Sequence, residues 1–288
     1  MKQRTTVIVV SYNKRPYTEL CLRGMLEATP SPEQIIVVDN GSSDGSVVFL
    51  EDDFAEQCRA HGTEYVLIAN SDNAGACTAR NQALKVTNGD YIAFCDNDLG
   101  VRSRNWLATL ADTLEQYPEV GIVGPKLLFP HAPYDIECGG VGISPNGRVQ
   151  YFGRGQSKDS PQSCEPKTVQ CLTSACWLMR RELYEQIGEL DEIFNPAQFE
   201  DFDYCYRARE AGWEVFYQPA AEMYHFENVT TAGSQDFNFK YITIKHGKLF
   251  KERWQHMFAT ENGPPDADCK WLDITIKSIE EIDTPPIV

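Results

Sequence analysis

Short apolar runs alternate with amphipathic stretches over the first 125 residues. The apolar runs have strand length and β-branched content, and they lie at residues 7–10, 35–38, 65–68, 91–95 and 120–123. Helix-length segments separate them at residues 16–28, 46–61, 75–86 and 104–117. This alternation predicts an α/β fold with a mostly parallel, Rossmann-like sheet and helices on both of its faces.

The pattern changes after residue 125. Residues 126–170 are rich in Gly and Pro and predict hairpins and loops, which would form a small antiparallel extension. Order then returns with a strand at 174–179, helices at 181–187 and 200–211, and two short strands at 214–217 and 223–226. Gly212 is placed to stop the second helix, and the polar residues 227–236 predict a mobile loop.

A basic amphipathic segment follows at residues 239–258. Its apolar residues recur at helical spacing, and its charges include Lys240, Lys245 and Lys248 against a single acid, Glu252. It predicts a helix that packs on the domain with its lysines in solvent, or one that touches an anionic membrane or lipid phosphate. The chain then divides into halves of one domain at 1–125 and 126–236, a helical segment at 237–260 and a peripheral appendage at 261–288, with one strand at 271–276.

Composition narrows the class of protein. The net charge is -16, with 42 acidic and 26 basic side chains, so the surface repels polyanions and a nucleic-acid partner is not expected. No apolar run approaches the roughly 18 residues of a membrane span, and no signal peptide is recognised. The ten cysteines are scattered singly, as buried thiols are in a reducing compartment. We expect a cytoplasmic protein or one that lies peripherally at the inner face of the membrane.

Polar residues follow three of the predicted parallel strands. Asp96-Asn97-Asp98 comes directly after the apolar run 91–95, and Ser11 and Asp39 end two other runs. Ligands of open α/β sheets bind at the carboxyl ends of the strands. Two carboxylates there repel each other, and a hard divalent cation that bridges to phosphate oxygens would satisfy both. A helix N-cap is the simpler interpretation of Asp98.

Two further residues fit a nucleotide site. The carboxylate of Asp39 could accept the ring N3–H of uracil or thymine, which predicts a uridine or thymidine nucleotide. An Asx-turn at the start of the following loop is the simpler interpretation. Arg80, on the third predicted helix, could pair with Asp39 or with the Asp96-Asn97-Asp98 carboxylates, or approach a diphosphate.

A second acidic centre opens the predicted helix at 200–211. Glu200 and Asp201 fall in its first turn, where the helix dipole favours the ionised carboxylate that a general base requires, although simple N-capping would also explain Asp201. Asp203 and Arg207 are four residues apart and could pair. His225 ends the last short strand, and an imidazole joins carboxylates around Mn²⁺ more readily than around Mg²⁺.

Taken in order, several segments resemble glycosyltransferase family 2, the inverting enzymes of the GT-A fold, and in particular its rhamnosyltransferase-like branch. The matching segments are residues 9–13, 37–44, 73–75 with 79–81, 96–98, 179–181 with 188–192, 199–203 with 207, and 225. Leu190 departs from the aromatic residue usual before the acidic pair 191–192, and residues 173–175 lack a Gly that the family often has. Both departures border the predicted acceptor side.

The resemblance implies roles for individual residues. A UDP- or dTDP-sugar would be held by Val10, Ser11, Tyr12, Asp39, Arg80, Asp96 and Asn97. Asp98 and His225, with Asp96, would hold a divalent metal, with Mn²⁺ favoured over Mg²⁺. Asp201, aided by Glu200, would deprotonate a glycan, lipid-linked or other hydroxyl acceptor. Asp191, Trp177 and Asp203 would contact that acceptor.

Two other functions share such a sheet. A sugar-phosphate nucleotidyltransferase should carry a Gly-rich loop after the first strand, but residues 11–16 contain no glycine. A non-catalytic nucleotide-sugar or carbohydrate-binding protein would not need intact acids at Asp96, Asp98 and Asp201. Sugar transfer is therefore the function that the sequence favours.

Overall fold

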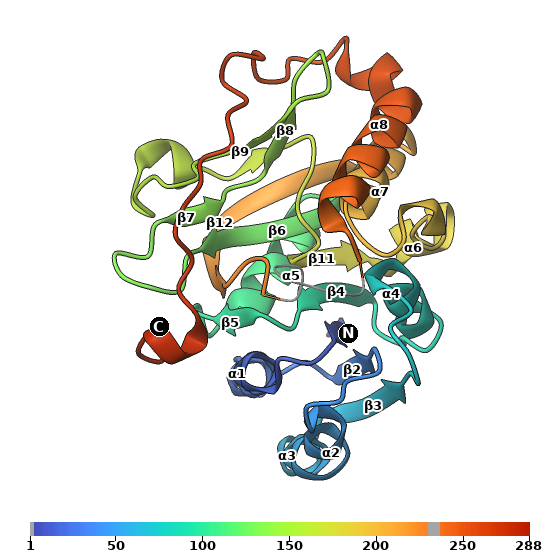
Figure 1. Cartoon of the computed structure of the whole chain (residues 1–288), viewed down its shortest axis with the longest axis vertical. Coiled ribbons are helices and arrows are strands. Elements are labelled where there is room, and N and C mark those ends of the chain that lie inside the picture. The colour runs from blue at the N-terminus through green and yellow to red at the C-terminus, as the bar shows by residue number, and fades with distance from the viewer. Residues whose placement is uncertain (1–2, 230–236) are drawn as a thin grey trace.

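A single mixed sheet forms the centre of the computed structural model, which describes residues 3–229 and 237–288 (Figure 1). Its strand order is β10-β12-β6-β11-β4-β1-β2-β3, with β5 paired to β12 and β7 to β6. The strands are β1 (Thr5–Ser11), β2 (Gln34–Asp39), β3 (Glu64–Ala69), β4 (Tyr91–Asp96), β5 (Leu99–Val101), β6 (Val120–Leu128), β7 (Ile136–Cys138), β10 (Lys167–Thr168), β11 (Cys176–Arg180) and β12 (Glu214–His225). A separate hairpin joins β8 (Val141–Ile143) to β9 (Val149–Tyr151).

The predicted parallel core is confirmed. Strands β4, β1, β2 and β3 run parallel, and β12 runs parallel to β6. Strand β11 is antiparallel to both of its neighbours, β4 and β6, and joins the two parallel groups. Every residue of β2 is buried, which is why its sequence is a continuous apolar run without alternation.

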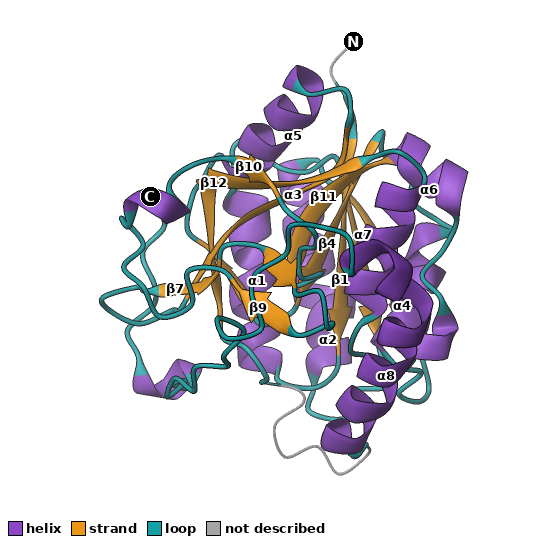
Figure 2. Cartoon of the chain, turned by 90° about the horizontal axis from the view of Figure 1, so that it is seen from above, coloured by secondary structure: helices purple, strands orange, loops and turns teal. Residues whose placement is uncertain are grey.

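Helices cover both faces of the sheet, as predicted (Figure 2). They are α1 (Arg15–Glu27), α2 (Ser46–Phe49), α3 (Ala55–His61), α4 (Ala76–Leu84), α5 (Trp106–Gln116), α6 (Arg181–Ile187), α7 (Glu200–Glu210) and α8 (Phe239–Phe258). A π-helical turn, Leu50–Phe54, joins α2 to α3, so the segment predicted at 46–61 is helical throughout. No helix in the part of the chain that the structure describes has both the length and the apolar character needed to cross a membrane.

Two predictions about strands are wrong. The short strands expected at 214–217 and 223–226 are one strand, β12, whose pairing with β6 is irregular between Gln218 and Glu222. That irregularity accommodates Pro219, which has no N–H to donate to a neighbouring strand. The strand expected at 271–276 does not form, because the carbonyl oxygen of Leu272 accepts a hydrogen bond from the Arg154 side chain and not from a neighbouring strand, and Trp271 packs against Tyr151. Most of the predicted loop at 227–236 lies outside the described residues.

Helix α8 packs against α7 through the side chain of Asp203. This buried carboxylate accepts hydrogen bonds from Arg253 Nη1 at 2.9 Å and from Trp254 Nε1 at 2.8 Å. The predicted Asp203–Arg207 pair is therefore wrong: Arg207 donates to the backbone carbonyl oxygens of Glu189 and Ile187. Helical spacing allowed the pair, but Asp203 faces α8.

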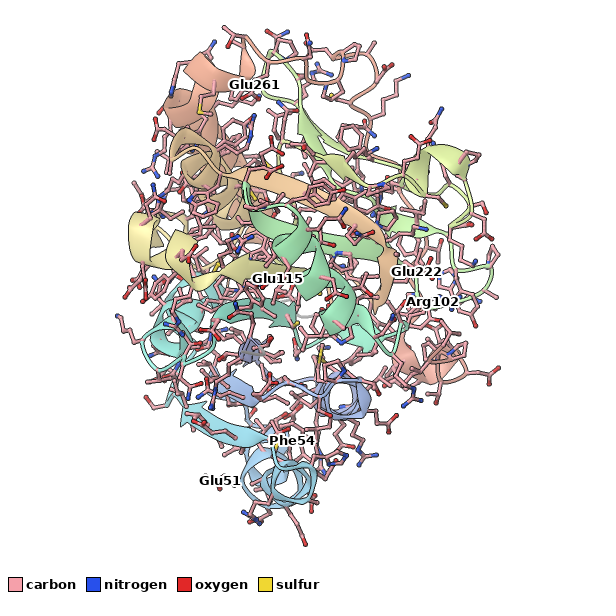
Figure 3. The ribbon with its side chains drawn as sticks, turned by 180° about the vertical axis from the view of Figure 1, so that it is seen from behind. Glu51, Phe54, Arg102, Glu115, Glu222 and Glu261 are labelled. Carbon is pink, nitrogen blue, oxygen red and sulfur yellow. The ribbon has the colours of Figure 1, made fainter. Side chains whose placement is uncertain are left out.

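The residues after α8 run past β9 and β7 and end beside α1 (Figure 1). We call residues 261–288 the C-terminal tail. The tail is held at several points: Arg154 Nε donates to Leu272 O at 3.0 Å, Ile279 N donates to Tyr17 Oη at 3.0 Å, and Val288 N donates to Arg102 O at 2.7 Å. Arg102 in turn pairs with Glu222 of β12 at 2.7 Å (Figure 3).

Candidate active site

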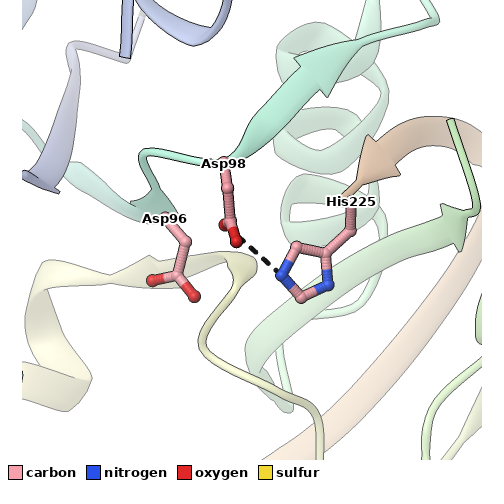
Figure 4. Close-up of side chains that lie close together, drawn as sticks. All are labelled: Asp96, Asp98 and His225. Atoms are coloured by element: carbon pink, nitrogen blue, oxygen red, sulfur yellow. Dashed lines mark ion pairs between the residues drawn. The ribbon is translucent and has the colours of Figure 1, made fainter. Parts of the chain in front are cut away.

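Three potential metal ligands meet where β4, β5 and β12 end or begin. Asp96 is the last residue of β4, Asp98 immediately precedes β5, and His225 is the last residue of β12 and pairs with Leu99. One ligand atom from each lies within 4.8 Å of the others, and Asp98 Oδ1 is 3.5 Å from His225 Nε2 (Figure 4). The N-cap of α5 is Asn105, so the simpler interpretation of Asp98 is excluded.

The residues of this cluster fit a divalent cation. Two carboxylates and one imidazole are ligands that Mn²⁺ accepts. Burial lowers the pKa of His225, but the Asp98 and Glu137 carboxylates outweigh it and raise the pKa well above its ordinary value. A cation held by Asp96, Asp98 and His225 would replace the proton on His225 Nε2 and supply the positive charge beside Asp98.

The contact of Glu137 with this cluster was not predicted from the sequence. Glu137 is buried on the short strand β7, and its Oε2 atom lies 3.5 Å from His225 Nδ1. A carboxylate on the remaining ring nitrogen fixes the orientation of a metal-binding histidine. Residues 126–170 have no regular pattern from which this contact could be recognised.

A cavity of about 540 Å³ connects the metal-ligand cluster to the second acidic centre. Its lining contains nine of the predicted site residues: Val10, Tyr12, Arg80, Asp96, Asn97, Asp98, Glu200, Asp201 and His225. Ser11 is buried and contacts Thr18 through its hydroxyl, so it does not line the cavity. Strand ends from both halves of the chain thus face one open cavity.

Arg80 joins the two acidic centres. Its buried guanidinium donates to Asp96 Oδ1 at 2.6 Å and to Glu200 Oε1 at 3.0 Å. The helix that carries it, α4, starts after Gly75, whose φ of +87° and close contact with Asn195 leave no room for a Cβ atom. Of the partners predicted for Arg80, the structure shows a carboxylate of the Asp96-Asn97-Asp98 segment and not Asp39.

Asp201 lies in the first turn of α7, as predicted, and Phe199 occupies the N-cap position. The Asp201 carboxylate accepts backbone hydrogen bonds from Ser174 at 3.2 Å and Phe202 at 2.8 Å. Burial and the neighbouring Glu200 charge raise the pKa of Asp201 to about 8. The helix dipole therefore does not keep this acid ionised at neutral pH, contrary to the sequence-based expectation, but a carboxylate with this pKa is a stronger base.

Asp39 does not line the cavity. It is fully buried, and its two oxygens accept hydrogen bonds from the backbone N and the hydroxyl of Ser42 at 2.8 and 2.7 Å. These bonds form a local turn at the start of the following loop, which was the simpler interpretation of Asp39. The neighbouring Asn40 lines the cavity instead.

The three predicted acceptor residues lie away from the cavity lining. Trp177 is buried in the core, stacked between Phe94 and Tyr204 with ring centroids 5.6 and 6.1 Å away. Asp203 holds α8, and Asp191 caps a short 3-10 helix. Aromatic and acidic residues that the sequence did not single out line the cavity in their place: Glu137, Tyr151, Glu227 and Trp271.

Solved structures share this fold. GalNAc-T7 with UDP, GalNAc and Mn²⁺ superposes with a TM-score of 0.68 at 15% identity, over 89% of this chain and 50% of that one. The mannosyltransferase PcManGT from Pyrobaculum calidifontis, in complex with GDP-Man and Mn²⁺, superposes with a TM-score of 0.60 at 19% identity, over 90% of this chain and 71% of that one. Both confirm the GT-A fold.

The chain also has relatives of similar sequence, and one of them is a glycosyltransferase. An uncharacterized protein, y4gI of Sinorhizobium fredii, is 28% identical over 85% of this chain, which spans only 27% of that protein's length. The N-acetylglucosaminyl-diphospho-decaprenol L-rhamnosyltransferase of Mycobacterium tuberculosis is 24% identical over 78% of this chain and 76% of its own length. The sequence profile of glycosyl transferase family 2 matches residues 6–188, so the chain belongs to that family.

Proposed function

We propose that this protein is an inverting glycosyltransferase that moves a sugar from a nucleotide-sugar to a hydroxyl acceptor in polysaccharide or glycoconjugate synthesis. One observation carries the proposal: a group of metal ligands and a basic carboxylate, Asp201, line the same cavity. The nucleotide and Mn²⁺ named for the two structural neighbours support it.

Asp98 and His225 are the proposed direct metal ligands. Asp96 has one oxygen engaged by Arg80, which leaves the other for the ribose or for the metal. When bound, a divalent cation supplies charge stabilisation for the departing diphosphate. Glu137 holds the His225 ring so that Nε2 faces the cluster.

Asp201 is the proposed general base. The backbone N–H groups of Ser174 and Phe202 fix its carboxylate, and it takes the proton of the acceptor hydroxyl as that oxygen attacks the anomeric carbon. Attack on the face opposite the leaving diphosphate inverts the anomeric centre. Glu200 contributes through Arg80, which it helps to hold against Asp96.

A UDP- or dTDP-sugar is the proposed donor. Val10, Tyr12 and Asn40 line the cavity beside the buried Asp39, whose carboxylate has lone pairs beyond those that Ser42 uses. A thermal-shift screen with UDP-, dTDP- and GDP-sugars, with and without Mn²⁺, tests this choice. Metal-dependent stabilisation by the uridine or thymidine sugars is expected. Stabilisation by GDP-sugars alone would reject the proposal that Asp39 accepts the ring N3–H of uracil or thymine.

The outer face of α8 supports a membrane-bound acceptor. Tyr241 and Ile244 are 63% and 66% exposed, and exposed lysines flank them at Lys240, Lys245 and Lys248. Apolar side chains among lysines suit the surface of an anionic bilayer. Phe239 and Thr243 of the same helix line the cavity, so a lipid-linked sugar on that surface would lie near Asp201. The lipid named for the Mycobacterium relative is consistent with such an acceptor.

A further inference from the structure

An exposed tryptophan from the C-terminal tail lines the active-site cavity. Trp271 is 56% exposed, whereas most of the other large aromatic side chains in the described part of the chain are buried. Its indole meets the ring of Tyr151 edge to face, with centroids 5.3 Å apart and an angle of 76°. Tyr151 lines the same cavity. A large aromatic surface kept open to a cavity indicates a ligand for it.

Arg154 holds this tryptophan in place. The carbon of its guanidinium lies 4.1 Å from the centroid of a Trp271 ring, and its Nε atom donates to the carbonyl oxygen of Leu272. The two remaining nitrogens bind Glu137 at 3.2 Å and Glu227 at 2.8 Å. The guanidinium covers one face of the indole, and the 56% of the Trp271 surface that stays exposed is available to a ligand.

The chemistry of the surroundings identifies the class of that ligand. A pyranose combines a ring of C–H groups, which packs on an aromatic face, with hydroxyls that bind carboxylates. Here the aromatic pair lies beside Glu227, and Glu137 links Arg154 to the metal ligand His225. The proposed nucleotide-binding residues Val10 and Tyr12 lie on β1 and in the loop after it, whereas Tyr151 belongs to the separate β8–β9 hairpin.

We infer that Trp271 and Tyr151 form the stacking platform of the acceptor subsite, and that a pyranose ring of the acceptor lies on the exposed surface of the Trp271 indole. The inference rests on the proposed glycosyltransferase function. It assigns to the tail the acceptor contact that the sequence had placed on Trp177, Asp191 and Asp203.

Saturation-transfer NMR with methyl pyranosides of glucose, galactose, N-acetylglucosamine and rhamnose tests the platform, on full-length protein with UDP and Mn²⁺ present. At least one of these sugars should bind the unmodified protein. Trp271→Ala should weaken that binding about tenfold, and Trp271→Phe should restore most of it. Leu272→Ala is the matched control, because Leu272 is half exposed and does not line the cavity.

Donor binding, measured by thermal shift with nucleotide-sugars, separates the two proposals. It should be equal in all variants. If the unmodified protein binds no nucleotide-sugar, the proposed function fails. If the donor binds but Trp271→Ala behaves like Leu272→Ala, or no methyl pyranoside binds the unmodified protein, the platform is rejected. Weakened donor binding in Trp271→Ala alone would also reject it, since the indole would then belong to the donor site.

Discussion

The Nε2 atom of His225 lies 3.5 Å from Oδ1 of Asp98, at the point where β12 ends beside β5. Against the effect of burial, the Asp98 and Glu137 carboxylates raise the pKa of His225 well above its usual value and so favour the doubly protonated ring when no metal is bound. A metal bound at Nε2 must displace the proton on that nitrogen. The affinity for Mn²⁺ should therefore rise with pH, by up to tenfold per pH unit below that pKa, as measured by calorimetry between about pH 6 and pH 9.

Variants of the same cluster provide the control. Glu137→Gln should weaken Mn²⁺ binding by about 10- to 100-fold, because Glu137 orients the His225 ring and is not itself one of the proposed metal ligands. His225→Gln should weaken it further and also remove the pH dependence. Asp112→Asn, on the exposed face of α5, should change neither quantity. An unchanged pH profile in His225→Gln would show that another group sets it.

Asp201→Asn should lower the rate of sugar transfer by about 10²- to 10⁴-fold, the usual contribution of a general base. The amide keeps the shape of the side chain and can still accept one of the two backbone hydrogen bonds, so the donor should bind normally. Steady-state transfer rates and nucleotide-sugar thermal shifts measure the two effects. Asp52→Asn, an exposed acid of the π-helical turn, serves as the control. Full activity in Asp201→Asn would place the base elsewhere.

The pH dependence of transfer should follow Asp201. Since its pKa is about 8, only the small ionised fraction acts below that value, and the rate at saturating metal should rise about tenfold from pH 6 to pH 7 before levelling above pH 8. A rate that is constant from pH 6 to pH 9 would contradict this assignment.

The same raised pKa should appear in stability. The folded protein holds a proton on Asp201 that the unfolded chain releases near pH 4, so its contribution to stability falls as pH rises from about 4 to about 8. Asp201→Asn does not lose stability in this way. The melting temperature of the variant should therefore rise relative to that of the unmodified protein between about pH 5 and pH 8, and the difference should stay constant above pH 8.

Removing the carboxylate that anchors α8 should destabilise the fold. Asp203→Ala leaves Trp254 Nε1 and Arg253 without their buried acceptor, and we expect a loss of about 2–4 kcal/mol in the free energy of unfolding, measured by urea denaturation. Glu252→Ala, which removes only an exposed ion pair with Lys248, should cost less than about 1 kcal/mol. Equal losses in the two variants would show that Asp203 does not anchor the helix.

Contact of α8 with anionic lipid is tested by flotation with vesicles of phosphatidylcholine alone or with phosphatidylserine. Binding should require phosphatidylserine and weaken with salt. Replacing Lys240, Lys245 and Lys248 by Glu should abolish it. Replacing Lys14, Lys85 and Lys277 by Glu makes the same change in net charge elsewhere on the chain and should leave flotation intact. Flotation that does not depend on anionic lipid would remove this partner.

The sequence predicted those parts of the structure that follow from local patterns. Buried parallel strands are continuous apolar runs, so β1 to β4 were placed within two residues at each end. Polar residues at their carboxyl ends must share one edge of the sheet, and this brought Asp96 and Asp98 to the cavity. The end of β12 added His225.

Burial and long-range packing could not be obtained in this way. The pKa of Asp201 depends on its enclosure and on Glu200, and the sequence gives only its place at a helix start. Trp177 and Asp203 have suitable chemistry for an acceptor site, but the fold places both among core contacts. Glu137 lies in a segment without periodicity, and Trp271 lies in one whose pattern predicted a strand that does not form, so only the folded chain shows that they line the cavity.

The tail that carries Trp271 lies beyond residues 6–188, which match the family profile. The proposed metal ligands Asp96 and Asp98 lie inside that stretch, whereas the Trp271 indole reaches the cavity from the C-terminal tail. Substitutions in the tail can therefore accumulate, or a whole tail can be exchanged, while the donor machinery stays intact. Related chains that share the first 188 residues but differ in the tail should diverge in the sugars that they extend before they diverge in the nucleotide that they use.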